Sequence, residues 1–220
     1  MSRIPVPSEA APTLPRPTPS GPTSSTTPTT TTPGPPPVGP AAVAPAGAGD
    51  EADRRVVQEL LDRYDRALTD LSAAPEAADD PADPILAAWH AVVPAGSELD
   101  EGVRGRIRGR RAEGLRVEPV EPGTLSYVHR AEEVVRSAPP AGVLPPPEEL
   151  AFTWCGWSPG LGRRVSGPGG GPGPVVDDAV AHALGTGRVV RPGPDEPWML
   201  GDLLESELTL LPPGSTDPCG

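Results

Sequence analysis

Apolar residues recur at helical spacing in the segment that follows residue 50. The positions that fit an i, i+3, i+4, i+7 pattern are Val57, Leu60, Leu61, Tyr64, Leu68 and Leu71. This spacing gives a helix one apolar face, and Asp50 is a residue type that caps helix N-termini. We therefore predict an amphipathic helix that starts at Asp50 and ends near Leu71.

Two shorter helices are predicted after a Pro/Ala/Asp-rich linker at residues 73–83. Asp83 followed by Pro84 is typical of a helix start, because proline is favoured at the first helical position. The apolar stripe of this helix consists of Ile85, Leu86, Trp89, Val92 and Val93. The next helix is expected between residues 97 and 114, where Gly114 is placed to end it. Its apolar stripe consists of Leu99, Val103 and Ile107.

The hydrophobic period changes to about 2 after Leu115, which indicates strands. Strands are predicted at residues 117–120, 124–135, 149–157, 175–184, 188–190 and 198–210. The strand at 149–157 is apolar on both faces, and this predicts a central, covered position in a sheet. Helices that precede a run of strands indicate an α+β fold, with one curved antiparallel sheet wrapped over the helices. The Pro/Gly-rich loops at 137–147 and 166–174 are expected to be mobile.

Residues 1–50 differ sharply in composition from the rest of the chain. They are almost entirely Pro, Thr, Ser, Ala and Gly, and their charged residues are Arg3, Glu9, Arg16 and Asp50. So few apolar side chains cannot offset the entropy cost of ordering, so we predict a disordered tail with polyproline II character. The expected organisation is this tail at 1–50, one α+β domain at 51–212 and a C-terminal tail at 213–220.

The formal net charge of −12 argues against a nucleic-acid or anionic-membrane partner. No apolar stretch is long enough for a transmembrane helix, and no signal-peptide core follows Met1. If Met1 is the true start, the expected location is cytoplasmic. A Pro/Thr-rich tract before a domain is typical of a spacer at a cell surface or after a membrane anchor. We therefore predict an extracellular or cell-envelope protein with an export segment upstream of Met1.

Lysine and asparagine are absent from the chain. Their codons are AT-rich, so the composition indicates a GC-rich bacterium such as an actinobacterium. This concerns the source of the protein and does not bear on its function.

The chain has two cysteines, Cys155 in a predicted strand and Cys219 next to the C-terminus. Two cysteines without a CxxC motif are too few for a zinc site. If the protein is exported, a disulfide that staples the C-terminal tail to the sheet is expected, and it would contribute about 4 kcal/mol. The alternative is two unrelated thiols.

The order of elements, a long helix, short helices and then curved antiparallel strands, resembles the nuclear transport factor 2-like superfamily of cystatin-like cone domains. The segments FTWCGWSPG (152–160), PVVDDAVAHALGTGRVVR (174–191) and PWMLGDLLE (197–205) resemble the last strands of such domains in actinobacterial exported proteins and lipoproteins. The final strand of those domains carries a Trp-to-Asp order that Trp198 and Asp202 keep here. The resemblance covers residues 52–211, and it implies a curved sheet around a cone-shaped interior.

Enzymes of this superfamily, among them steroid isomerases, scytalone dehydratase and SnoaL-type polyketide cyclases, place Asp, His and Tyr inside the cone. The candidates for such acid–base chemistry in this chain are His129, His182 and Asp178. The residues expected to line a ligand pocket are Trp89, Tyr127, Trp154 and Trp198. The alternative is that these aromatic residues fill the core and the histidines are merely hydrogen-bonded. No motif indicates a metal or a cofactor.

Five arginines stand close together in the third predicted helix, Arg104, Arg106, Arg108, Arg110 and Arg111. At helical spacing, 104, 108 and 111 share one face and 106 and 110 share another. The default interpretation is a solvated face balanced by nearby acids, and the alternative is a site for an anionic partner.

The preferred interpretation is a non-catalytic cone domain on a Pro/Thr-rich stalk that binds a small ligand or a protein partner. The alternative is a SnoaL-like isomerase, cyclase or hydratase acting on a small apolar substrate. A third interpretation is a cytoplasmic accessory domain that forms a homodimer through its sheet.

Overall fold

The computed structural model of the protein describes residues 48–137, 147–164 and 173–220. The predicted tail up to residue 47, and most of the two loops predicted to be mobile, lie outside these ranges. The helices are α1 (Ala48–Ala73), the 3-10 helix η1 (Pro75–Asp79), α2 (Pro84–His90) and α3 (Glu98–Ala112). The strands are β1 (Leu115–Glu118), β2 (Val128–Arg136), β3 (Glu148–Ser158), β4 (Leu161–Arg164), β5 (Val175–Asp177), β6 (Val180–Arg191) and β7 (Met199–Leu211).

The helices begin and end for local reasons that the sequence contains. The Asp83 carboxylate accepts a hydrogen bond from the Ile85 N–H at 2.8 Å, and the Ser97 hydroxyl accepts one from the Asp100 N–H at 3.2 Å. Gly114 ends α3 with φ of +70°, a backbone conformation that favours glycine. The start of α1 at Ala48 lies two residues before the predicted cap, Asp50.

Two expectations about the helical region were wrong. The predicted linker contains η1, in which Pro75 starts the turn and two small alanines are buried. The second helix ends at His90, so Val92 and Val93 are buried in the turn that follows it, before Pro94.

The strands form two antiparallel sheets, so the fold class is α+β as predicted. One sheet has the order β2-β3-β6-β7, and the other has the order β1-β4-β5. The central position predicted for the strand at 149–157 is confirmed, because β3 pairs with β2 on one side and with β6 on the other. The prediction of a single sheet was wrong.

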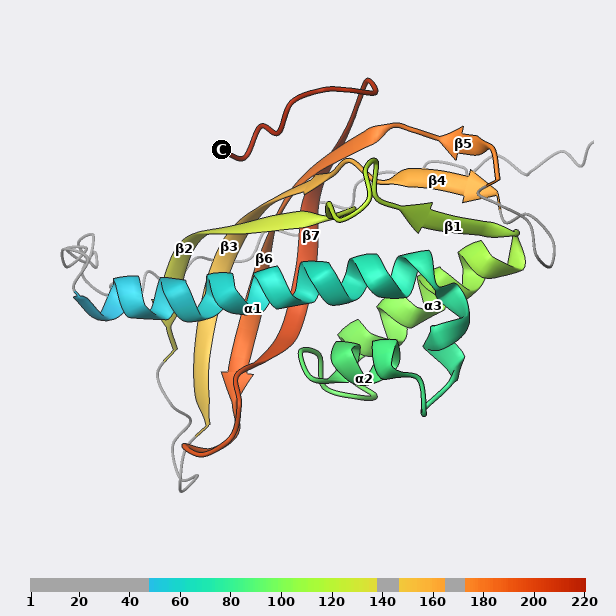
Figure 1. The fold of residues 1–220 in the computed structure, drawn as a ribbon. Helices are drawn as coiled ribbons and strands as arrows, with labels where there is room; N and C mark the ends of the chain where they lie inside the picture. The colour runs from blue at the N-terminus through green and yellow to red at the C-terminus, as the bar shows by residue number, and fades with distance from the viewer. Residues whose placement is uncertain (1–47, 138–146, 165–172) are drawn as a thin grey trace, which may run out of the picture. The chain divides into compact units, whose positions relative to one another are not determined.

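The two sheets are joined where two neighbouring chain segments pass from one sheet into the other side by side. β3 continues into β4 after Pro159 and Gly160, and β5 continues into β6 after Asp178 and Ala179. Pro159 has no N–H for a ladder bond. A Cβ atom at Gly160 would stand 2.7 Å from Val117 Cγ1, so this close approach requires glycine. The four-stranded sheet therefore turns into the three-stranded one along this hairpin (Figure 1).

The strand boundaries predicted between residues 175 and 190 were wrong in two places. The Asp177 carboxylate accepts a hydrogen bond from the Ala179 N–H at 3.1 Å, a local turn that separates β5 from β6. Gly185 and Gly187 do not interrupt β6, because both pair with residues of β3. Aromatic rings from β3 occupy the space above them, which explains the absence of side chains there. Cβ atoms there would lie 2.4 Å from Trp154 Cζ2 and 2.4 Å from Phe152 Cζ.

The core lies between the helices and one face of the four-stranded sheet. Leu150, Phe152 and Trp154 of β3 point toward α1, and all three are buried. In Figure 1, α1 crosses the strands of this sheet, and α2 and α3 lie beside its C-terminal half. None of the helices in the described ranges is long and apolar enough to cross a membrane.

A buried carboxylate links α2 to α3. Asp100, which has no exposed surface, accepts hydrogen bonds from Trp89 Nε1 and the Gly96 N–H, both at 2.8 Å. Arg104 Nε lies 3.1 Å from it. Burial raises the pKa of Asp100, but the hydrogen bonds from Gly96 and Trp89 and the Arg104 charge outweigh burial and hold this pKa below its usual value.

Asp100→Ala is therefore expected to lower the free energy of unfolding by about 3–5 kcal/mol, because it leaves buried donors and a cation without their partner. Denaturant titration at neutral pH measures this loss. Asp202→Ala removes a carboxylate from an ion pair whose Arg188 side chain is half exposed, and the expected loss there is under about 1 kcal/mol. Equal losses in the two variants would contradict the assignment.

The contacts of Asp100 also predict how the stability of the protein depends on pH. The folded-state pKa of Asp100 lies below its unfolded value of about 3.9, so its contribution is present above that pH and is lost as pH falls through the folded pKa. The stability difference between wild type and Asp100→Ala is thus expected to narrow below about pH 4.

Candidate functional site

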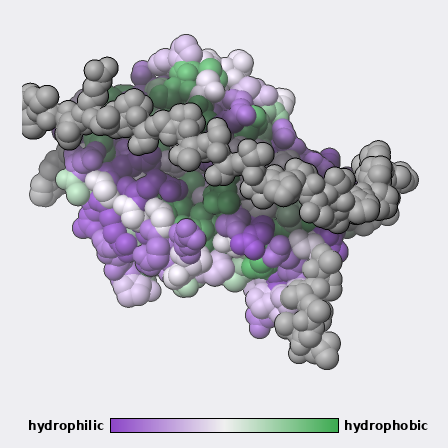
Figure 2. Space-filling view, turned by 180° about the vertical axis from the view of Figure 1, so that it is seen from behind, coloured by the Kyte–Doolittle hydropathy of each residue, from purple (hydrophilic) through white to green (hydrophobic). Residues whose placement is uncertain are grey.

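A cavity of about 700 Å³ lies between the helices and the inner faces of both sheets. Its walls come from α1, α3, β1, the start of β2, and the bent hairpin formed by β3 to β6. The last wall is β7, whose Leu204, Leu208 and Leu210 are exposed. Figure 2 shows apolar groups at the surface among hydrophilic ones.

The strand register explains why this space is hollow. On the inner face, aromatic Phe152 and Trp154 of β3 pair with Gly187 and Gly185 of β6, which leaves no room. The next two pairs along the same face are Gly156 with Ala183 and Ser158 with Ala181. All four of these residues are small and line the cavity, and the Trp154 ring and His129 lie over Gly156.

His129 lines the cavity, and Asp65 of α1 contacts both its backbone and its ring. The Asp65 carboxylate accepts the His129 backbone N–H at 2.7 Å and lies 2.5 Å from ring atom Nδ1. The ring stands edge-on to Tyr64 and to Trp154, with centroids 5.6 and 5.0 Å apart. Since Nδ1 is engaged by Asp65, Nε2 is the ring nitrogen left for a ligand.

Burial dominates the electrostatics behind His129. Asp65 is 1% exposed, and burial raises its pKa, while the hydrogen bonds from His129 act in the opposite direction. Burial and the neighbouring Asp65 also raise the pKa of Tyr64 well above its usual range, so Tyr64 stays a neutral phenol. The arrangement is a carboxylate–imidazole pair beside an apolar space, which is suited to move a proton or to orient a polar ligand group.

Two further side chains of α1 join Asp65 in holding this part of the chain. Thr69 Oγ1 accepts a hydrogen bond from the Ser126 N–H at 3.1 Å. Gln58 accepts one from the Ala131 N–H at 3.0 Å and donates one to the His129 carbonyl at 3.1 Å. Residues 58, 65 and 69 share one face of the helix, so α1 satisfies the otherwise open edge of β2.

The arginines of α3 divide as their helical spacing predicts. Arg104, Arg108 and Arg111 form ion pairs with Asp100, Glu101 and Asp79. Arg106 and Arg110 lie on the other face and line the cavity. Arg110 donates a hydrogen bond to Tyr127 Oη at 3.1 Å.

The residues predicted to line a pocket lie in three different places. Tyr127 and Trp154 line the cavity. Trp89 is fully buried in the helical core against Tyr64 and Asp100. Trp198 packs under Arg191, whose guanidinium carbon lies 5.0 Å from the ring centroid.

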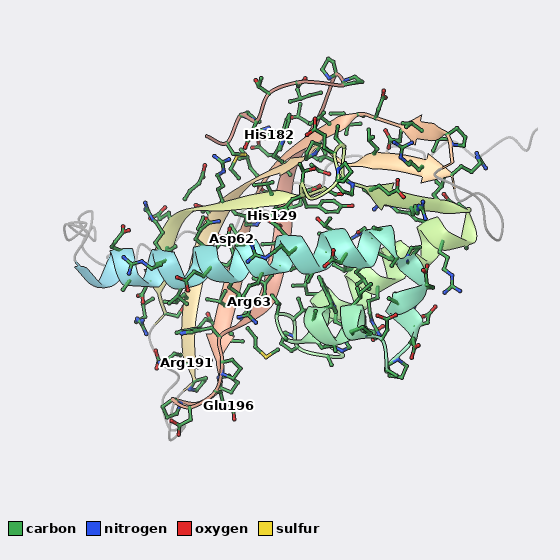
Figure 3. The ribbon with its side chains drawn as sticks, in the orientation of Figure 1. Asp62, Arg63, His129, His182, Arg191 and Glu196 are labelled. Atoms are coloured by element: carbon green, nitrogen blue, oxygen red, sulfur yellow. A yellow bond between two sulfur atoms is a disulfide. The ribbon has the colours of Figure 1, made fainter. Side chains whose placement is uncertain are left out.

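The three candidate acid–base residues are not brought together. His129 lines the cavity, whereas His182 lies on the opposite face of the sheet, with Nε2 3.4 Å from Cys155 Sγ. Figure 3 shows His129 between α1 and the sheet and His182 on the side of the C-terminal segment. Asp178 is exposed in the break between β5 and β6.

Asp65 is the site residue that pattern reasoning missed. It follows Tyr64 on the apolar side of the first predicted helix, and it is nearly as buried as Leu61 and more buried than Leu68. An acid at such a position is the signal that could have found it, because a buried carboxylate needs partners.

On the outer face of the four-stranded sheet, Cys155 of β3 and Cys219 are joined in a disulfide, with Cα atoms 5.7 Å apart. An ion pair between Arg130 and Asp217, at 2.7 Å, holds the same C-terminal segment. In the described part of the chain, His182 and the two sulfurs are close enough to ligate an ion, but both sulfurs are used in the disulfide.

Comparison with known proteins yields little similarity. No protein-family model matches the sequence, and no curated protein matches it. Among solved structures, the chain is similar to one described as the intermembrane space region of the chloroplast protein ARC6. The two share 10% sequence identity and a TM-score of 0.36, over 72% of this chain and 96% of that one.

Opening the disulfide is expected to destabilise the domain. The bond closes a loop with a sequence separation of 64, so Cys219→Ser is expected to cost about 4 kcal/mol and to lower Tm by roughly 10 °C. Differential scanning calorimetry measures this change. A reductant is expected to lower the Tm of the wild type by a similar amount and to leave Cys219→Ser unchanged. A wild-type Tm that is insensitive to reductant would contradict the prediction.

Proposed function

We propose that residues 51–212 form a nuclear transport factor 2-like cone that binds a small, mostly apolar ligand and has no catalytic role. The observation that carries this proposal is the cavity of about 700 Å³. Its volume falls in the usual range of small-molecule sites. The larger part of its lining is apolar, and charged and polar groups, among them His129 and Tyr127, share it.

Two features support the cone and its setting. The bend shared by β3–β4 and β5–β6 curves the strands around the helices, as the resemblance implies. The Cys155–Cys219 disulfide supports export, because disulfides persist in oxidising compartments. In this proposal the Pro/Thr-rich segment that precedes α1 is a stalk that holds the domain at the cell envelope.

Titration with a neutral naphthylamine dye, whose fluorescence rises in apolar surroundings, tests the cavity directly. We expect saturable binding to the wild type. Ala183→Phe is expected to reduce dye affinity at least tenfold, because it places a ring at a position that lines the cavity. Ala88→Phe, on the exposed side of α2, serves as the control and is expected to bind as the wild type does.

Ala183→Phe could perturb the sheet, so a second variant separates binding from folding. Leu208 lines the cavity and is 54% exposed, so Leu208→Glu is tolerated by the fold but places a charge in the apolar wall. Weaker dye binding by Leu208→Glu at unchanged Tm supports the proposal. Absence of saturable binding to the wild type would refute it.

The His129–Asp65 pair favours a second candidate function, a SnoaL-like isomerase, cyclase or hydratase. In this alternative, His129 Nε2 is the general base and Asp65 orients the ring. Incubation with β,γ-unsaturated ketones, followed by the absorbance of the conjugated product, tests for isomerisation. If turnover is found, His129→Gln is expected to lower kcat by at least about 100-fold. His182→Gln, on the other face of the sheet, is expected to retain the wild-type rate.

A further inference from the structure

Two arginines that line the cavity have no acidic partner. Arg106 and Arg110 are one helical turn apart on α3, and within the described residues neither lies within 4.0 Å of a carboxylate. The chain has 30 acidic and 18 basic residues, so carboxylates are not scarce. Like charges at i, i+4 also weaken a helix slightly. Both side chains are exposed, and this pair of cations stands at one wall of the cavity without a carboxylate partner.

The contacts around these arginines leave donors available. The recorded partner of Arg110 is the neutral hydroxyl of Tyr127, which occupies one of its five N–H donors. The positive charge of Arg106 acts on buried Tyr64 and lowers its pKa against the effect of burial, which places this charge near the ring beside His129.

The other charged groups of the cavity wall do not neutralise these two arginines. Arg116 pairs with Glu118 of the same strand. The two acids of the wall are Asp177 of β5, which accepts the Ala179 N–H, and Glu205 of β7. Neither of them forms an ion pair with Arg106 or Arg110, so the α3 side of the cavity remains cationic.

The wall on β6 and β7 has the opposite character. Ala181, Ala183, Leu203, Leu208 and Leu210 line it, and Trp154 adds an aromatic surface. A ligand that spans the cavity thus meets guanidinium groups on α3 and a largely apolar wall on β6 and β7, which also carries the carboxylate of Glu205.

We propose that the ligand is a small amphipathic carboxylic acid, whose carboxylate is held by Arg106 and Arg110 and whose hydrocarbon part lies against β6 and β7. This inference rests on the proposed function and narrows its ligand class. Guanidinium groups bind carboxylates through paired N–H donors, and this bonding is stronger than that between neutral groups.

Displacement of the neutral dye by decanoate and by decanol, which share one hydrocarbon chain, tests the charge requirement. We expect decanoate to bind at least tenfold more tightly than decanol at low ionic strength, and this preference is expected to shrink in high salt. The double variant Arg106→Gln/Arg110→Gln is expected to lose about tenfold in decanoate affinity and to bind decanol within twofold of the wild type. The double variant Arg55→Gln/Arg66→Gln removes two exposed arginines of α1 outside the cavity, and it is the matched control for net charge.

The outcomes separate the two levels of the proposal. If the dye and both competitors fail to bind, the ligand-binding function itself is refuted. If the dye binds but decanoate and decanol compete equally, or if the arginine variant weakens both equally, the cavity binds apolar ligands and the carboxylate assignment is wrong. A loss of decanoate affinity in Arg55→Gln/Arg66→Gln equal to that in Arg106→Gln/Arg110→Gln would also overturn it, because bulk charge would then explain the preference.

Discussion

The structure depends on how α1 closes the free edge of β2. That edge strand and the turn before it expose backbone groups that would otherwise need water or another strand. Thr69, Asp65 and Gln58 supply the missing partners at Ser126, His129 and Ala131. These three side chains lie along one face of α1, and the later a residue stands in the helix, the earlier its partner stands in the segment formed by β2 and the turn before it. The three contacts together fix the position of α1 along the sheet. They therefore also fix the wall that α1 contributes to the cavity.

This edge closure explains why one carboxylate has a structural and a chemical role. A buried carboxylate is costly unless it is hydrogen-bonded, and His129 supplies both a backbone and a ring donor to Asp65. The bond to the backbone anchors β2, and the bond to the ring turns His129 Nε2 toward the cavity. Any ligand or substrate that contacts His129 is thus coupled to the contact that positions α1.

Local patterns predicted the helices and the central strand because each of these depends on nearby residues. The caps at Asp83 and Ser97 and the division of the α3 arginines into two faces follow from spacing alone. The continuity of β6 through Gly185 and the separation of His182 from His129 depend on which strand lies opposite. The role of Asp65 likewise depends on β2, which lies 64 residues away in sequence. A pattern along one strand cannot contain that information.

The boundary between packed core and cavity follows from side-chain size along two paired strands. From Leu150 to Trp154, β3 presents large side chains on the inner face. Their partners on β6 are Val189 and two glycines, so the large side chains fill the space. Beyond Trp154 the inner faces of both strands present only small residues, and these residues line the cavity. Well-packed cores pair large residues with small residues across a sheet. Where two small residues are paired, the van der Waals contacts that larger aliphatic residues would have made are lost. The guanidinium groups of Arg106 and Arg110 stand at the edge of that same cavity, where a bound acid would restore both the apolar contacts and the charge balance.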